Sequence, residues 1–261
     1  NGMEFKNGTF NVSLNSGAIG FVYLGNGLGT TTSADITTYL NNYYTGLNNL
    51  YFTMDSASRL FVVERFGTIN LSDVQNLSTS GTLVNIVSGS SGKEAYLWKG
   101  SLIVDGSYGV IDLDNPANVL NNVERSAVGV TLNSGVSLIG TNNGQIGLAD
   151  VDIYNSNYVN MDNKGVIILS GANGIGIYTS NGTITNNGQV STTGLNSVAL
   201  YGENSSKITN STGSSITIGD KGIGIYGISY QNPVATPPSY GLGKITITNS
   251  GTIQATTGTE A

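Results

Sequence analysis

The chain has 261 residues, of which 38% are hydrophobic and only 10% are charged, and its formal net charge is −6. It contains no Cys and no His, which excludes disulfides, Cys metal sites, thiol nucleophiles and Ser-His-Asp chemistry. Its 10 Lys and Arg residues are scattered singly, so no nucleic-acid partner is expected. The longest apolar stretches, such as Leu60–Val63, are too short to span a bilayer.

The N-terminal part, residues 1–127, is irregular but strand-like. Short runs that alternate apolar and polar side chains predict strands at Met3–Phe5, Phe10–Leu14, Ile19–Leu24, Leu50–Thr53 and Leu60–Val63. All six Phe residues precede position 67, so a wider core or an extra covering element is expected here. No linker separates this part, and we predict a single domain over residues 1–261. Because no N-terminal signal is visible, we interpret the chain as a fragment of a longer protein.

Between Leu28 and Asn49 the apolar spacing changes to that of an amphipathic helix. The residues on its apolar face are Ile36, Tyr39, Leu40, Tyr43, Tyr44 and Leu47. Ser33 or Asp35 is predicted to cap the helix and Gly46 to end it. The simplest role of this helix is to cover apolar surface. Its tyrosines, Tyr39, Tyr43 and Tyr44, are also candidate ligand-binding residues.

Two further segments are expected to leave the stack of strands. Residues 112–126 contain Pro116, and residues 228–243 contain three prolines, which cannot donate to a strand ladder. In the second segment, Tyr230 and Tyr240 are candidate ligand-binding residues, because loops on a rigid scaffold commonly carry binding sites. The alternative is a loop with no binding role.

Residues 128–261 repeat with a period of about 24. The clearest marker is an apolar strand that ends in a tyrosine, at Tyr178, Tyr201 and Tyr226, and the intervals between these tyrosines are close to that period. Val151–Tyr154 and Val128–Leu132 extend this series towards the N-terminus. A second marker, Asn followed closely by Gly, recurs at Asn142, Asn163, Asn186, Asn210 and Asn249.

Each period contains three short strand-like pieces, as in Ile175–Tyr178, Thr183–Thr185 and Gln189–Ser191. One period cannot bury its own apolar side, so neighbouring periods must stack. We therefore predict an all-β fold, a right-handed parallel β-helix with three short strands per coil, inserted loops and one short helix. A β-propeller needs a longer period, and the leucine-rich repeat frame is absent.

Stacking in register predicts columns of like residues, two dozen positions apart. The predicted apolar columns are Ile175 with Val198 and Ile223, Ile177 with Leu200 and Ile225, Ile184 with Ile208, and Val190 with Ile216 or Ile218 and then Ile253. The Asn marker predicts an amide ladder through Asn186, Asn210 and Asn249, and the tyrosines predict an aromatic stack.

Catalytic chemistry has few candidates in this sequence. Two carboxylate pairs could serve a polysaccharide hydrolase or lyase, Asp112 with Asp114 and Asp150 with Asp152. The only Arg residues, Arg59, Arg65 and Arg125, are not beside them in sequence, and Asp residues do not recur at the coil period as calcium repeats require. We expect no catalytic residues, no cofactor and no metal, and an enzyme remains the second alternative.

The phrase Gly-Ile-Gly-Ile-Tyr, followed by Gly-Thr-Ile-Thr-Asn-Asn-Gly and Thr-Thr-Gly, occurs at residues 174–194 and recurs in altered form at 197–219 and 222–258. It resembles the passenger repeats of large type V autotransporter adhesins, and in particular giant fusobacterial outer-membrane adhesins. The resemblance covers roughly residues 128–258 and is weaker towards the N-terminus.

This resemblance implies a passenger that is exported unfolded and displayed at the cell surface, attached to the outer membrane or secreted. Any membrane attachment would be through a translocator barrel that is not in this chain. The implied function is an adhesin segment that binds host or bacterial cell-surface glycans or proteins through loops on a rigid stalk. The alternative is a purely structural spacer. The sequence does not identify the ligand.

Overall fold

The computed structural model describes residues 3–4, 8–46, 49–78, 84–149, 159–229 and 244–256. Among the residues that the structure describes, strands make up 53% and helices 9%, and the sheets are parallel, so the predicted all-β class is confirmed. The chain divides into two compact units. Unit 1 comprises residues 1–103 and 119–126, and unit 2 comprises residues 104–118 and 127–261. The single domain over 1–261 stays a prediction.

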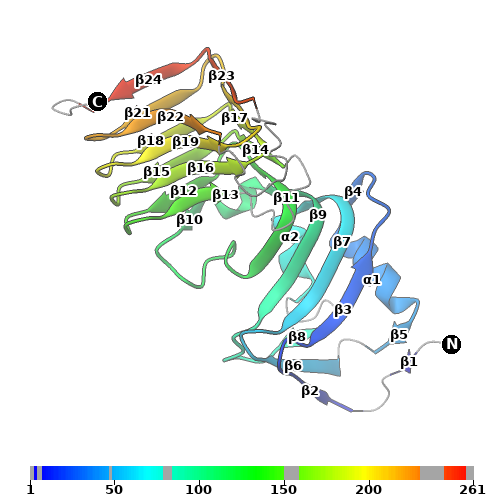
Figure 1. The fold of residues 1–261 in the computed structure, drawn as a ribbon. Coiled ribbons are helices and arrows are strands. Elements are labelled where there is room, and N and C mark those ends of the chain that lie inside the picture. The colour runs from blue at the N-terminus through cyan, green and yellow to red at the C-terminus, as the bar shows by residue number, and fades with distance from the viewer. Residues whose placement is uncertain are drawn as a thin grey trace, which may run out of the picture. The chain divides into compact units, whose positions relative to one another are not determined.

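Unit 2 is built from short parallel strands in three sheets (Figure 1). Its strands are β10 (Val110–Asp112), β12 (Ser137–Gly140), β13 (Ile146–Ala149), β14 (Asn160–Asn163), β15 (Val166–Leu169), β16 (Ile175–Ser180), β17 (Thr183–Asn186), β18 (Gln189–Thr192), β19 (Val198–Glu203), β20 (Lys207–Asn210), β21 (Ser215–Ile218), β22 (Ile223–Ile228), β23 (Thr246–Asn249) and β24 (Thr252–Ala255), with most of β11 (Val123–Leu132).

The chain visits these three sheets in turn. One sheet has the strand order β10-β12-β15-β18-β21-β24, the second has β13-β16-β19-β22, and the third contains β11, β14, β17, β20 and β23. The strands β16, β17 and β18 therefore lie in different sheets, and β19, β20 and β21 return to the same three sheets in the same order. Each strand pairs with the one that follows it a full period later.

The register of these pairs confirms the predicted apolar columns. Ile177 pairs with Leu200, which pairs with Ile225, and Ile177 and Leu200 are fully buried. Ile184 pairs with Ile208. Val190 pairs with Ile216 and not with Ile218, and Ile216 pairs with Ile253. The predicted column of Ile175, Val198 and Ile223 also aligns, but it does not face the core, since Ile223 is 42% exposed. The buried columns remove aliphatic side chains of adjacent layers from water together, which is the stabilising term that a single layer cannot supply.

The predicted ladder of Asn side chains is also confirmed, and it includes one residue more than expected. The side-chain amide of Asn163 donates to the Oδ1 of Asn186, Asn186 donates to Asn210, and Asn210 donates to Asn249, each at 2.8 Å. The first three of these residues are completely buried. Buried amides are tolerated here because each finds its partner one layer away.

The predicted tyrosine stack is confirmed for the described residues. The rings of Tyr178 and Tyr201 meet edge to face at 5.5 Å, and those of Tyr201 and Tyr226 are tilted at 5.2 Å. The hydroxyls of Tyr178 and Tyr201 both donate to the Glu203 carboxylate, at 3.1 and 2.7 Å. The row is therefore fixed at both its rings and its hydroxyls.

The predicted continuation of the tyrosine series towards the N-terminus was wrong, and that of the Asn series holds only as far as Asn163. Leu132 pairs with Asn163 and so belongs to the Asn ladder's column, whereas Tyr178 pairs with Ala149. Asn142 does not align with Asn163. Ile146 and its partner Ile175 are separated by more residues than one regular period, because a longer connection follows β13. Counting back by one period therefore assigns the wrong residues to each column. Tyr154 lies outside the described residues.

Unit 1 contains longer strands and two helices. Its elements are β1 (Met3–Glu4), β2 (Phe10–Leu14), β3 (Ile19–Leu24), β4 (Thr30–Thr31), α1 (Ser33–Asn41), β5 (Tyr44–Thr45), β6 (Leu50–Met54), β7 (Arg59–Asn70), α2 (Leu71–Asn76), β8 (Asn85–Ile86) and nearly all of β9 (Lys93–Val104). The strand β7 pairs with β3, β4 and β9, the strand β6 pairs with β2 and β8, and β1 pairs with β5.

The predicted strands of unit 1 are confirmed, but Leu60–Val63 is only part of the much longer β7. The wide core that the Phe residues predict is packed against β7. The rings of Phe21 and Phe61 stack at 5.5 Å, and Phe52 and Tyr44 meet the edge of Phe21 at 5.7 and 6.0 Å. Phe61 and Phe66 are fully buried.

The predicted helix exists as α1, with Ile36 and Leu40 buried, but both of its predicted ends were wrong. Thr32 is the N-cap rather than Ser33 or Asp35, and Asp35 closes a capping box with it. The helix ends at Asn41, before Gly46, and Tyr44 lies in β5, where pairing with β1 replaces helical hydrogen bonds. Leu47 lies outside the described residues.

The expectation of one helix was also wrong, because α2 follows β7 directly. Its Leu71 and Val74 are buried, as is Leu77 one turn beyond, so a single apolar stripe holds it on unit 1. The predicted loop at 112–126 is shorter than expected, because β10 ends at Asp112 and β11 begins at Val123. A 3₁₀ turn, η2 (Gly106–Tyr108), precedes β10. Most of the predicted loop at 228–243 lies outside the described residues.

Candidate functional site

The structure brings the candidate tyrosines of α1 together with one that the sequence did not single out. Tyr39 lies on α1 and Tyr43 just beyond its end, while Tyr23 lies on β3. The ring of Tyr39 meets Tyr23 edge to face at 5.2 Å and is tilted against Tyr43 at 5.4 Å. Tyr39 is therefore the central ring of a row of three.

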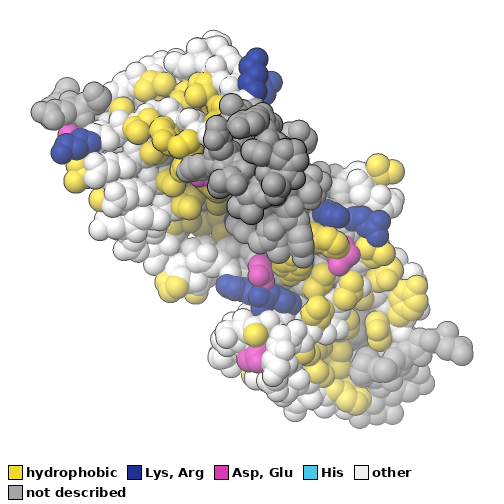
Figure 2. All heavy atoms as spheres, in the orientation of Figure 1, with side chains coloured by type: hydrophobic (Ala, Val, Ile, Leu, Met, Phe, Trp, Pro, Cys, Tyr) yellow, Lys and Arg dark blue, Asp and Glu magenta, His cyan; other side chains and the backbone are white. Residues whose placement is uncertain are grey.

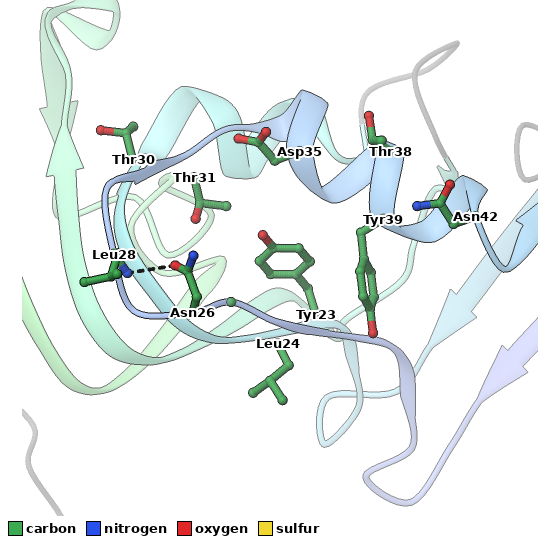
Figure 3. A pocket seen from close by; sticks show the side chains of 11 residues that line it. Tyr23, Leu24, Asn26, Leu28, Thr30, Thr31, Asp35, Thr38, Tyr39 and Asn42 are labelled. Atoms are coloured by element: carbon green, nitrogen blue, oxygen red, sulfur yellow. Dashed lines mark hydrogen bonds between the residues drawn. The ribbon is translucent and has the colours of Figure 1, made fainter.

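A polar hollow of about 540 Å³ lies on one side of Tyr39, within unit 1. It is lined by Tyr23, Leu24, Gly25, Asn26, Leu28, Thr30, Thr31, Asp35, Thr38, Tyr39 and Asn42. Figure 3 shows the ring of Tyr23 between Tyr39 on one side and Asn26 on the other, while Leu24 points away. This size is in the range of pockets that hold small molecules.

A smaller hollow of about 340 Å³ lies on the other side of Tyr39. It is lined by Gly20, Phe21, Val22, Tyr39, Leu40, Tyr43 and Tyr44. All three predicted tyrosines, Tyr39, Tyr43 and Tyr44, therefore line this hollow, and Tyr39 lines both. Tyr43 is 53% exposed, so its ring is available to a partner in solution.

The floor of the larger hollow is fixed by backbone contacts to β7. The backbone N–H groups of Gly25 and Gly27 donate to the carbonyls of Glu64 and Arg65, at 2.8 and 2.7 Å. A Cβ on Gly25 would lie 2.5 Å from the Arg65 carbonyl oxygen, so only glycine fits this approach. The buried Thr31 hydroxyl donates to the Phe66 carbonyl at 2.6 Å. The loop after β3 is thereby ordered before any ligand arrives.

The wall formed by α1 is fixed at its N-terminus. The Thr32 backbone N–H and hydroxyl both donate to the Asp35 carboxylate at 2.8 Å, and these hydrogen bonds lower the pKa of Asp35. The backbone and hydroxyl of Ser33 donate to Asp73 on α2, at 3.0 and 3.1 Å. Tyr39 therefore stands on a helix that is capped and tied to its neighbour.

The residues of the two hollows combine aromatic faces with hydroxyl, amide and carboxylate groups. Such a combination suits a ligand whose rings are apolar on their faces and carry hydroxyls on their edges. It offers neither a nucleophile activated by a base nor a paired acid and base. The two hollows are therefore a candidate binding site.

The sequence predicts Tyr39, Tyr43 and Tyr44 as ligand-binding residues but does not include Tyr23, Asn26 and Asp35, which line the larger hollow. Tyr23 could have been recognised because the alternation within Ile19–Leu24 places it on the same side of the strand as Phe21. No local signal marks Asn26, whose Oδ1 accepts from the Leu28 N–H at 2.9 Å within the loop. Tyr230 and Tyr240 lie outside the described residues.

The carboxylates of the pair Asp112 and Asp114 both accept hydrogen bonds that hold the local backbone. The Asp114 carboxylate accepts from the backbone N–H groups of Thr141 and Asn142, the Thr141 hydroxyl and the Gln145 amide. These hydrogen bonds, led by that of the Thr141 hydroxyl, lower the pKa of Asp114 to about 2. A carboxyl that is ionised at all physiological pH values cannot donate a proton as a general acid. Asp150 and Asp152 lie outside the described residues.

Charge and metal chemistry are sparse in the part of the chain that the structure describes. No group of three or more His, Cys, Asp or Glu side chains there could hold a metal ion. Figure 2 shows the Lys and Arg side chains of the visible face in small separate groups. None of the helices in the described ranges is long and apolar enough to cross a membrane.

Searches with protein-family models, among curated proteins and among solved structures found no match to this chain. The site must therefore be interpreted from its own geometry.

Proposed function

We propose that this chain is a segment of a surface-displayed adhesin that binds glycans or proteins of host or bacterial cells. The observation that carries the proposal is the pair of aromatic-lined hollows around Tyr39, which rest on a floor of parallel strands. Rigid aromatic side chains lose little conformational entropy when they bind, and a preordered floor reduces the cost further. Both features favour recognition over catalysis.

We further propose that the stacked strands form a right-handed parallel β-helix with three short strands per coil. The in-register return of β19 and then β22 to the sheet of β16, each after one further period, supports this architecture. The right hand follows from the strong preference of crossovers between parallel strands. Such a stack would serve as the stalk that presents the site.

The proposed location is the cell surface, with the chain either attached to the outer membrane or secreted. The resemblance of residues 128–258 to autotransporter passengers supports this location. The absence of Cys agrees with export of an unfolded chain, since no disulfide could obstruct threading.

The proposal is tested by measuring binding of the fluorescently labelled chain to bacterial cells, to epithelial cells and to an array of glycans. We expect saturable binding that a heat-unfolded sample lacks. If the folded chain bound none of the three, the adhesin function would be contradicted and the structural spacer would remain. Replacing Tyr230 and Tyr240 with Ala in the same assay tests whether residues 228–243 contribute to binding.

A further inference from the structure

Tyr39 lies between two hollows of different chemistry. On the side of Tyr23, the larger hollow offers Asp35, Thr38 and Asn42 as hydrogen-bonding groups. On the side of Tyr43, the smaller hollow is formed mainly by aromatic rings and by Val22 and Leu40. A ligand that filled both would place a polar unit on one side of the ring and an apolar face on the other.

A sugar chain has this alternating character. Each pyranose ring carries hydroxyls around its edge and presents C–H groups on a face, which packs against aromatic rings. Consecutive sugars are joined by one oxygen atom, so neighbouring rings can occupy neighbouring hollows. The two hollows, about 540 and 340 Å³, share Tyr39 as their only common residue.

The charge of the site restricts the kind of sugar. No Lys or Arg is among the residues that line either hollow, and Asp35 contributes a negative charge to the larger one. A uronic or sialic acid would bring its carboxylate towards Asp35 without a cation to balance it. Neutral sugars meet no such repulsion, and hydroxyl groups can donate to the Asp35 carboxylate.

We propose that Tyr39 divides a two-subsite binding site for a neutral oligosaccharide, with one sugar in the polar hollow and the next against Tyr43. This inference rests on the proposed adhesin function and names the ligand class and the residues of its site. The affinity of the site would depend on the number of sugars in the ligand, because a single sugar fills only the polar subsite.

The test uses neutral hexose and N-acetylhexosamine saccharides of one, two and three units, with calorimetric measurement of Kd. With the wild-type chain, we expect a disaccharide to bind at least ~10-fold more tightly than its monosaccharide. The disaccharide in which one sugar is replaced by its uronic acid, and a sialylated disaccharide, are expected to bind more weakly than the neutral disaccharide. Equal affinity for one and two units, or preference for the acidic forms, would overturn the proposal.

Three variants separate the subsites. Tyr43→Ala is expected to leave the monosaccharide Kd within ~2-fold and to remove the gain from the second sugar. Tyr39→Ala should weaken disaccharide binding at least ~10-fold, while Tyr39→Phe, which keeps the ring, should stay within ~3-fold. Tyr51→Ala is the matched control, because Tyr51 is 37% exposed on β6 and lines neither hollow.

The outcomes distinguish this inference from the proposed function. Glycan binding that is insensitive to Tyr39→Ala in a correctly folded variant would place the site elsewhere and leave the adhesin function standing. Binding to cells without binding to any neutral saccharide would overturn the oligosaccharide site alone. Circular dichroism and the melting temperature of each variant establish that it is folded.

Discussion

Glu94 is a carboxyl group within unit 1 that is only 9% exposed. The Ser78 hydroxyl donates to it, and its backbone N–H donates to the Asn122 carbonyl at 3.0 Å. Burial disfavours the charged form and raises the pKa of Glu94 from its ordinary value of 4.5 to about 7, against the smaller opposing effect of Ser78. Near neutral pH this single residue is poised between its two forms.

A raised pKa makes folding stability depend on pH in a defined direction. The native state keeps the Glu94 proton that the unfolded chain loses above pH 4.5, so this group's contribution to stability is greatest below pH 4.5. As the pH rises to about 7, that contribution falls by on the order of 3 kcal/mol. We expect Glu94→Gln to remove this fall and to exceed the wild type in stability at pH 8.

The measurement is urea unfolding at pH 4.5, 6 and 8. Glu64→Gln on β7 serves as a control in which Glu94 is intact and the wild-type decline should persist. A wild-type chain whose unfolding free energy did not decline between pH 4.5 and 8, relative to Glu94→Gln, would contradict the assignment.

At the scale of single elements, α1 determines how the site is built. Its apolar face holds Ile36 and Leu40 in the core, so the outward-facing Tyr39 keeps a fixed position. The capping box of Thr32 and Asp35 satisfies backbone N–H groups that the first helical turn leaves without partners. A helix of nine residues depends on such contacts, because it is too short to be stable by itself.

Removing the cap is expected to have a measurable cost. Thr32→Ala should lower the free energy of unfolding by about 1 kcal/mol, because the Asp35 N–H loses its acceptor and the Asp35 carboxylate loses its hydroxyl donor, keeping only the Thr32 backbone N–H. Thr32→Ser retains the hydroxyl and should lose less than half as much. Both values come from chemical denaturation. Equal stability of the wild type and Thr32→Ala would mean that the cap is dispensable and that packing alone holds α1.

The elements that could be predicted from the sequence are those with a strict local pattern. Ile177, Leu200 and Ile225 are predicted to share one column because the strands that carry them have the same apolar pattern before a tyrosine and are evenly spaced. The rows before Tyr178 could not be assigned, because the longer connection after β13 changes the spacing. The end of α1 was missed because Tyr44 pairs with Met3, far away in the sequence, and this pairing overrides the helical pattern.

The candidate site was predictable only in part for a related reason. Tyr39 and Tyr43 belong to one amphipathic pattern, so the sequence groups them. The partner ring of Tyr23 comes from β3, and the polar groups of Asn26 and Thr31 come from the loop that β7 holds in place. Such convergence depends on tertiary packing, which no local spacing encodes.

At the scale of the whole molecule, the protein depends on contacts between residues about two dozen positions apart. Neighbouring parallel strands lie about 4.8 Å apart, which is within the Cα separation that a disulfide can bridge. The chain has no Cys of its own, so an introduced pair reports one contact without competition. The sequence distinguishes the irregular residues 1–127 from the repeats of residues 128–261, but it does not predict that residues 104–118 belong to unit 2.

A pair of cysteines at Thr185 and Thr209 is expected to form a disulfide under mild oxidation, because these residues are partners in the pairing of β17 with β20. A pair at Thr185 and Thr217 is the control, since Thr217 belongs to β21 in another sheet. Mass spectrometry of peptides identifies the bond. Failure of the first pair to close in folded protein, or equal closure of both, would refute the stacked register.

The ladder of Asn side-chain amides from Asn163 to Asn249 runs through unit 2 in one direction. Each side-chain N–H₂ donates to the Asn of the layer that follows it along the chain, so all the amide dipoles point the same way and strengthen one another. Removing the Asn186 side chain would leave one N–H of the buried Asn163 amide without its acceptor, while the Asn210 Oδ1 would keep the Ser214 hydroxyl as a donor. A strand that slipped by one residue would take its Asn out of the ladder and turn Ile184 or Ile208 outward. The hydrogen bonds of this Asn ladder therefore form in only one register of successive layers.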